Sequence, residues 1–314
     1  MRYQATDASS VAEIGAPLLG CDLTTESCRT AMNAIGGSAQ NNGSPMGALT
    51  DSHGIAIDSV ATLNIPAGRE IAFAGLYWSA NKYTTDAWTG APNTIQLRAP
   101  GATSSFKNVT GAVIADVTDN ANRSYYQSFA DVTDIVRDPV TKALRAGGAG
   151  DWAATGAAVS ETAHDPDHTY YAGWALVVVY ADSVAGGNVT VFDGGAWVAT
   201  NQSTTFAFGA AENLNAQVGV VAWDGDRGGS GSGDALTLNT TGALMPIRSD
   251  GLNGFVGDAF NSTATGSVFK NSLGTDAKAF APTTLNGGIN RLTASTAGDQ
   301  YLIGVVTLKT TPAN

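Results

Sequence analysis

The chain has 314 residues, and only 14% of them are charged, against about 25% in ordinary soluble domains. Its formal net charge is −11 and it has no Lys/Arg-rich run, which argues against nucleic acid and anionic membranes as partners. With 38 glycines and few charges, the surface must consist largely of Ser, Thr, Asn, Gln and Gly, which is typical of secreted proteins.

The first 55 residues are predicted to form an irregular, loop-rich arm. It holds the two cysteines of the chain, Cys21 and Cys28, which we expect to form a disulfide. Closing so short a loop stabilises a fold by roughly 2–3 kcal/mol in the chain-entropy model. The alternative is two free thiols in a cytosolic protein. The C-x6-C spacing matches no familiar zinc or thioredoxin motif. Residues 28–35 are expected to form a short helix.

Export is expected from the polar, charge-poor composition, although the ends of the sequence carry no export signal. No stretch of 18 apolar residues is present, so no membrane insertion is expected, and residues 1–10 lack the pattern of a signal peptide. To reconcile export with the missing signal, we expect that a cleaved signal preceded Met1 and that "KTTPAN" begins a linker to further domains.

Nearly all of the remaining sequence predicts β-strands, separated by clusters of Gly, Asn, Asp and Pro. The expected strands are 60–65, 70–80, 94–99, 125–133, 151–159, 174–182, 188–194, 204–209, 216–224, 234–239 and 301–309. One further short helix is expected at 138–147, where Asp138 can cap and Pro139 can take the first helical position.

Two of these runs, 174–180 and 216–223, are apolar on both faces, so both faces of their sheets must be covered. Together with 71–78 and 301–308 they are predicted to lie centrally. The predicted fold is an all-β, antiparallel β-sandwich of jelly-roll-like topology. Residues 56–314 are expected to form a single domain, which includes long loop insertions between about 240 and 298.

Four blocks of sequence resemble the N-terminal head of large Gram-positive bacterial surface proteins, adhesin-like proteins that carry Ig-like repeats of the DUF11 kind and a wall anchor. The blocks are "IPAGREIAFAGLYWSA" (65–80), "YQSFADVTDIVR" (126–137), "YAGWALVVVYAD" with "NVTVFDG" (171–194), and "WDGDRGGSGSGDALTLN" (223–239). "GSGS" at 229–232 departs from the family as an insertion.

The resemblance implies an extracellular, all-β module at the cell surface or cell wall, followed by Ig-like repeats. It implies adhesion to a host or environmental surface through a glycan or a protein, and it supplies no catalytic residues. We predict attachment without catalysis. The alternatives are a carbohydrate-binding module or lectin, and a structural subunit of a surface filament that uses edge strands and the N-terminal arm for strand addition.

An acidic, glycine-rich loop is the candidate metal site. Asp224, Asp226 and Asp234 bracket it between two predicted strands, and their carboxylates can converge on Ca²⁺ where glycines allow a tight backbone. The spacing is not that of an EF-hand. The alternative is a surface turn in which Arg227 pairs with a carboxylate.

Two of the six tryptophans are candidate ligand-binding residues. Trp88 and Trp152 lie in or next to predicted loops, where an indole can stack on a sugar ring. Trp78, Trp174 and Trp223 lie in strand runs and are expected to fill the core. Loops such as 81–93 and 224–234 are thus the expected binding surface.

Other chemistry has weaker signals. The "HDPDH" motif at 164–168 offers two imidazoles and two carboxylates for zinc, but Pro166 prevents the helix that would align them, so a polar turn is the preferred interpretation. No G-x-S-x-G motif is present, and no enzyme is predicted. The sequence does not rule out a pair of carboxylates of the glycosidase kind, because spacing along the chain does not give their separation in space. A Lys–Asn isopeptide bond is also considered, with Lys309 and Lys82 as candidate lysines whose partners no motif fixes.

Overall fold

The computed structural model describes residues 1–314 except 7–8, 34–43, 52, 102, 146–149, 166–168, 184–186, 228–232, 240–242, 245–256 and 314. The described chain is all-β, as predicted, and every pairing between its named strands is antiparallel. Within these residues, no helix is long and apolar enough to cross a membrane.

Two sheets form the middle of the molecule. Sheet A has the order β1 (Tyr3–Ala5), β13 (Asn188–Val198), β20 (Tyr301–Pro312), β15 (Leu214–Trp223) and β17 (Thr275–Ala279), with β18 (Thr283–Leu285) also paired to β15. Sheet B has the order β2 (Ser9–Pro17), β12 (Ala172–Ala181), β6 (Ile71–Tyr83), β10 (Arg123–Asp131) and β9 (Ala112–Thr118).

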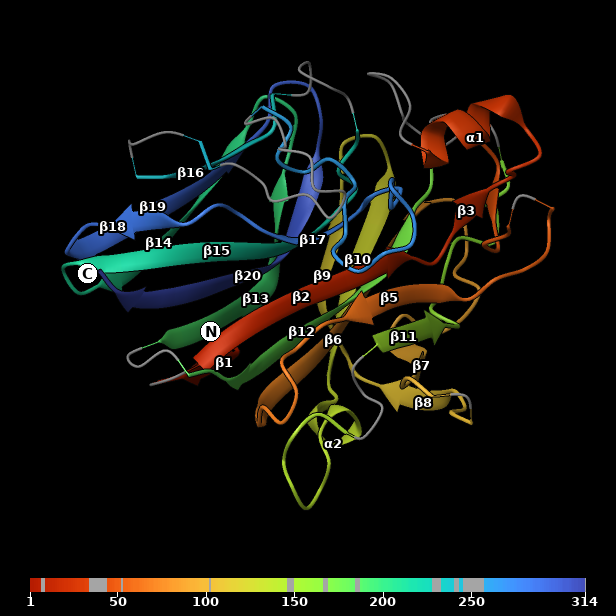
Figure 1. Ribbon diagram of the computed structural model, residues 1–314. Coiled ribbons are helices and arrows are strands. Elements are labelled where there is room, and N and C mark those ends of the chain that lie inside the picture. The colour runs from red at the N-terminus through yellow and green to blue at the C-terminus, as the bar shows by residue number, and fades with distance from the viewer. Residues whose placement is uncertain are drawn as a thin grey trace.

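Two smaller sheets cover the outer faces of this pair, so that the layers follow the order D, A, B, C (Figure 1). Sheet C has the order β5 (Ser59–Leu63), β11 (Gly150–Thr155), β7 (Thr94–Arg98) and β8 (Lys107–Thr110). Sheet D has the order β14 (Ser203–Ala210), β19 (Gly288–Ser295) and β16 (Ala235–Leu238). The remaining elements are β3 (Gly20–Cys21), β4 (Met46–Gly47), α1 (Glu26–Met32) and α2 (Thr133–Val136).

Alternating side chains of the central strands fill different cores. On β12, Leu176 packs between sheets B and C, whereas its neighbour Val177 packs between sheets A and B. On β15, Val220 faces sheet D and Val221 faces sheet B. This two-sided burial confirms the prediction that 174–180 and 216–223 are covered on both faces. The sandwich is thus confirmed, while its jelly-roll-like topology stays a prediction.

The N-terminal arm differs from the expected loose segment. Residues 9–17 form β2, which pairs with β12 along its whole length, from Ser9 opposite Ala181 to Pro17 opposite Gly173. The strand escapes notice in the sequence because it carries buried polar residues, including Glu13, whose carboxylate accepts a hydrogen bond from Thr307 of β20. The division of the chain at residue 55 stays a prediction.

Two further expectations change. Instead of a helix at 138–147, the structure has α2 at Thr133–Val136 followed by a turn, in which Asp138 accepts bonds from the amides of Val140 and Thr141. Lys142 has a left-handed φ of 59°, which a helix does not allow. The expected loop region 240–298 contains three described strands, β17, β18 and β19.

The predicted disulfide is present. Cys21 at the end of β3 is bonded to Cys28 in α1, and Thr25 caps this helix by accepting a hydrogen bond from the amide of Cys28. The helix is also tied to the far end of the chain, because the Asn271 side chain donates to the carbonyl of Ala31 at 3.0 Å. The disulfide thus closes a loop within the arm, and the hydrogen bond from Asn271 ties its helix to the body of the sandwich.

Reduction of this disulfide should lower the free energy of unfolding by roughly 2–3 kcal/mol, because the reduced unfolded chain regains conformations that the short loop forbids. Urea unfolding with and without reductant measures the difference. A Cys21→Ser, Cys28→Ser double variant is the control and should show one midpoint under both conditions. Equal midpoints for the unmodified protein would contradict a stabilising role for the bond.

Candidate functional site

A cavity of about 220 Å³ lies where the ends of sheets A and B meet, and we call it the acidic pocket. Its lining residues are Arg123, Thr169, Thr200, Asp224, Asp226, Gly298, Asp299 and Gln300. Three of them lie at strand ends: Arg123 begins β10, Asp224 directly follows β15, and Gln300 directly precedes β20. A rigid β scaffold therefore holds the groups that line it.

Backbone geometry turns Asp224 into the pocket. Asp224 has a left-handed φ of 68°, and its amide donates to the carbonyl of Gly274 at 2.8 Å. Its carboxylate accepts a hydrogen bond from the Tyr125 hydroxyl at 2.9 Å. The next residue must be glycine, because a Cβ on Gly225 would lie 2.4 Å from the carbonyl oxygen of Phe260.

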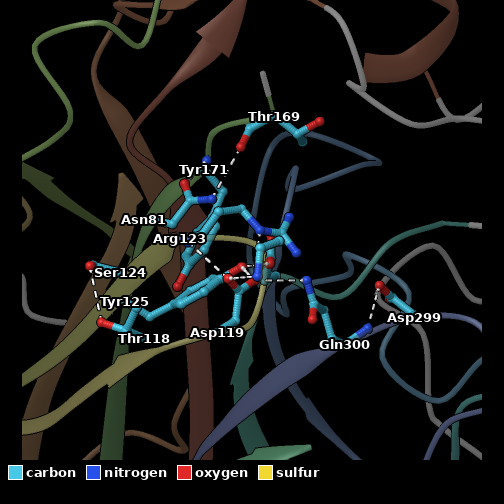
Figure 2. Close-up of polar contacts among 12 residues, drawn as sticks. Asn81, Thr118, Asp119, Arg123, Ser124, Tyr125, Thr169, Tyr171, Asp299 and Gln300 are labelled. Atoms are coloured by element: carbon cyan, nitrogen blue, oxygen red, sulfur yellow. Dashed lines mark hydrogen bonds and ion pairs between the residues drawn. The ribbon is translucent and has the colours of Figure 1, made fainter. Parts of the chain in front are cut away.

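Arg123 supplies the positive charge of the pocket (Figure 2). Its Nε donates to Asp119 Oδ2 at 2.8 Å, and the same oxygen accepts from the side-chain Nε2 of Gln300 at 3.1 Å. Asp119 also accepts from two backbone amides, those of Ala121 and Arg123, each at 2.8 Å. Desolvation opposes the charge of Arg123, but the nearby carboxylates outweigh it, with Asp224 the strongest, and raise the pKa of Arg123.

The carboxyl groups of the pocket have raised pKa values. Loss of hydration is the main cause, and repulsion from neighbouring carboxylates adds to it. Burial raises the pKa of Asp224 to about 7 and that of Asp226 to about 7, and it raises the pKa of Asp299 to about 8. The amide of Asp226 donates to Asp299 Oδ2 at 3.2 Å. Near neutral pH these groups can therefore both donate and accept hydrogen bonds.

The predicted metal residues are only partly brought together. Asp224 and Asp226 line the acidic pocket, but Asp234 is fully buried and precedes β16 of sheet D, so it does not flank β15 within one sheet. Across the described ranges, no group of three His, Cys, Asp or Glu side chains is arranged to hold a metal ion. The Ca²⁺ prediction gains no support from this geometry and stays a prediction.

The pocket contains an arginine that the sequence did not single out, whereas pairing of Arg227 with a carboxylate stays a prediction. Arg227 is buried and donates to the carbonyl of Lys270 at 3.0 Å. Arg123 takes the place in the pocket instead, together with Asp299 and Gln300. These residues lie far from the 224–234 loop in the sequence, so no motif or spacing connects them.

The two candidate tryptophans have different surroundings. Trp152 lies on β11 with no exposed surface and packs in the core between sheets B and C. The expected ligand contact at Trp152 needs correction, since its ring fills the core. Trp88 is half-buried, with its ring edge-on to Tyr126 at 5.0 Å and the Lys82 ammonium 5.5 Å from its centre. A ligand contact at Trp88 stays a prediction.

The "HDPDH" motif is described only in part. Residues 166–168 lie outside the described residues, whereas His164 ends the turn at 161–164 and Asp165 follows it. The Asp165 amide donates to the carbonyl of Thr162 at 2.8 Å, which fits the polar turn preferred from the sequence.

A second cavity, of about 160 Å³, lies between sheets A and D. Its lining is apolar and consists of Phe192, Phe206, Ala207, Phe208, Val218, Leu292, Val306 and Leu308. Binding sites orient their ligands through a few polar side chains, and this lining has none. The acidic pocket is therefore the better candidate.

No family model and no curated protein matches the chain. Among solved structures, BuGH86 in complex with neoagarooctaose aligns over 77% of this chain and 32% of its own, with 10% identity and a TM-score of 0.23, so this chain spans about a third of its length. The Sulfolobus Turreted Icosahedral Virus structure aligns over 98% and 91%, with 10% identity and a TM-score of 0.25. The Penaeus vannamei nodavirus particle aligns over 99% and 100%, with 9% identity and a TM-score of 0.20. At such TM-scores these similarities carry no argument about function.

Proposed function

We propose that the chain is an extracellular, non-catalytic attachment module of the adhesin kind, and that it binds a polyhydroxylated ligand such as a glycan in the acidic pocket. The observation that carries the proposal is the joint presence of Arg123 and the carboxyl groups of Asp224, Asp226 and Asp299 around one cavity. Sugar hydroxyls both donate and accept hydrogen bonds. The Arg123 guanidinium can donate to them, and the carboxyl oxygens can accept from them.

The cellular setting rests on separate observations. A disulfide and a surface poor in charge fit an oxidising, extracellular compartment. Attachment at a cell wall, and Ig-like repeats that follow the module, rest on the resemblance of the four sequence blocks to surface-protein heads. The strand ends that carry the pocket are where β scaffolds commonly display binding residues.

Binding to an array of neutral oligosaccharides tests the proposal. We expect at least one glycan class to bind, and an Asp226→Ala variant to bind it roughly tenfold or more weakly, because a hydrogen bond to a charged group contributes about 1.5–3 kcal/mol. Asp116→Ala, which removes an exposed carboxylate of β9, is the matched control and should bind as the unmodified protein does.

Two outcomes would contradict the proposal. The first is an array on which no glycan binds above background at neutral pH. The second is cleavage of a bound oligosaccharide that the Asp226→Ala change abolishes, since this would make the pocket an active site.

A further inference from the structure

Lys278 is a lysine buried in the core of the sandwich. It lies on β17, and its side chain is only 1% exposed. Three polar atoms surround its Nζ: Asn261 Oδ1 at 2.5 Å, Asp276 Oδ1 at 2.6 Å and Thr263 Oγ1 at 2.8 Å. A buried ammonium group is costly unless it is paired or loses its charge, so this arrangement calls for a physical reason.

The backbone brings these residues together from two segments. Asp276 and Lys278 are two residues apart on β17, so both side chains lie on the same face of sheet A. The segment 263–265 runs parallel to β17, with the amide of Ala277 donating to the carbonyl of Thr263 at 3.2 Å. This pairing places Asn261 and Thr263 beside the acid and the amine.

The surroundings exclude water. Asn261 is 1% exposed and Asp276 has no exposed surface. The core between sheets A and D lies against them, with the Phe260 ring 4.3 Å from that of Tyr301. Burial lowers the pKa of Lys278, although the charges of Asp276 and Asp258 oppose the shift. The neutral amine, which is the nucleophilic form, is thereby favoured.

Asp276 is placed to move protons between the two partners. Its Oδ1 contacts Lys278 Nζ and accepts from the Thr263 amide at 3.1 Å. Its Oδ2 is buried and has no hydrogen-bond partner among the residues that the structure describes. A carboxyl group held in this way can take a proton from one nitrogen and give one to another.

We propose that Lys278 and Asn261 form an intramolecular isopeptide bond, with Asp276 as the catalytic acid and base. A proton first passes from the Lys278 ammonium to Asp276. The free Nζ then attacks Asn261 Cγ, and a carbon–nitrogen bond forms. Asp276 gives its proton to Asn261 Nδ2 and takes one from Nζ, after which the original amide bond breaks and ammonia leaves. No oxidant, reductant or water is consumed.

The two lysines considered from the sequence have other contacts. Lys309 Nζ donates to Ser10 Oγ at 2.9 Å and lies 3.3 Å from Asp182 Oδ2. Lys82 Nζ donates to the backbone carbonyls of Tyr83 and Asp86. None of these contacts is to a side-chain amide, so the structure moves the candidate from these lysines to Lys278.

Mass spectrometry of the intact, reduced and unfolded protein tests the proposal. The measured mass should be lower than the sequence mass by one ammonia molecule. Trypsin should cleave after Lys270 but not after Lys278, and peptides 249–270 and 271–291 should remain joined after reduction. The joined peptides distinguish the bond from ammonia loss at a single asparagine.

Variants identify the three partners. Lys278→Arg, Asn261→Ala and Asp276→Ala should each have the full mass and separate peptides, whereas Lys309→Arg, the matched control, should keep the ammonia loss. The unmodified protein alone decides the matter even where a variant does not fold. A full sequence mass with peptides 249–270 and 271–278 found separately would overturn the proposal.

Discussion

Replacing Gly304 with alanine should lower the free energy of unfolding by about 3 kcal/mol. Gly304 lies on β20 of sheet A and faces sheet B, and a Cβ there would come within 1.7 Å of Gln127 Oε1 and 2.6 Å of Trp223 Nε1. Gln127 accepts a 2.5 Å bond from that indole and donates to the Gly304 carbonyl at 3.1 Å. The methyl group would displace Gln127 and leave the buried indole N–H of Trp223 without its partner.

Urea unfolding at neutral pH measures this change. Gly209→Ala on β14 is the matched control, since a Cβ there meets no atom within 4 Å and the backbone has no left-handed φ. The control should stay within about 0.5 kcal/mol of the unmodified protein. Equal destabilisation by both variants would assign the cost to strand propensity instead of to packing.

Stability should fall by several kcal/mol between about pH 4 and pH 8, and Glu13 should cause a large part of the fall. Glu13 is buried on β2, and burial raises its pKa to about 7, although the bond from Thr307 opposes the rise. A raised carboxyl pKa stabilises the fold fully below the unfolded pKa, near 4, and this contribution is lost as the pH rises through 7. For Glu13 this contribution to the free energy of unfolding amounts to about 3 kcal/mol, because each pKa unit of difference between the folded and unfolded states contributes about 1.4 kcal/mol.

The pocket carboxyls act in the same direction, because the pKa values of Asp224, Asp226 and Asp299 are also raised. Asp22 and Asp51, whose pKa values are lowered by hydrogen bonds, have the opposite effect on stability, and only at acidic pH. Their contribution is present above the unfolded pKa and is lost at lower pH.

A Glu13→Gln variant isolates the contribution of the buried acid. Glutamine keeps an oxygen for the Thr307 hydroxyl but cannot ionise, so the variant should be more stable than the unmodified protein at pH 8 and should show a shallower decline from pH 5. Glu212→Gln, at an exposed position, is the control and should leave the profile unchanged. Parallel profiles for Glu13→Gln and the unmodified protein would refute the assignment.

The central strands were predictable because burial on both faces leaves a direct mark in the sequence. The run "WALVVVYAD" has no polar alternation, and the structure covers both of its faces. Strand β2 left no such mark, because Ser9, Ser10 and Glu13 are buried in it, and partners from other strands hold two of them. Only the three-dimensional structure supplies those partners.

Only those residues of the candidate site that are close together in the sequence could be predicted from it. Asp224 and Asp226 stand out as acids in a glycine-rich loop, and both line the pocket. Arg123 and Asp299 reach it from remote parts of the chain. Asp234 precedes a strand of another sheet and does not line the pocket, although its charge helps to raise the pKa values of Asp226 and Asp299. Spacing along the chain carries no information about which strand ends will meet. Trp152 lies in the strand predicted next to a glycine-rich loop, but the sequence did not show that its ring fills the core between sheets B and C.

The last strand of the chain occupies the middle of its sheet, which sets the order of folding events. β20 lies between β13 and β15, and it pairs with residues 188–198 on one side and 214–223 on the other. Until β20 has paired, each of those two strands has an unpaired edge. Sheet A is then incomplete and cannot cover the core between sheets A and B. β2 likewise can pair only once β12 has been synthesised, more than 150 residues later in the sequence. Such pairings close long loops at an entropic cost, so folding should be slow and should be completed only after residues 301–312 have been synthesised.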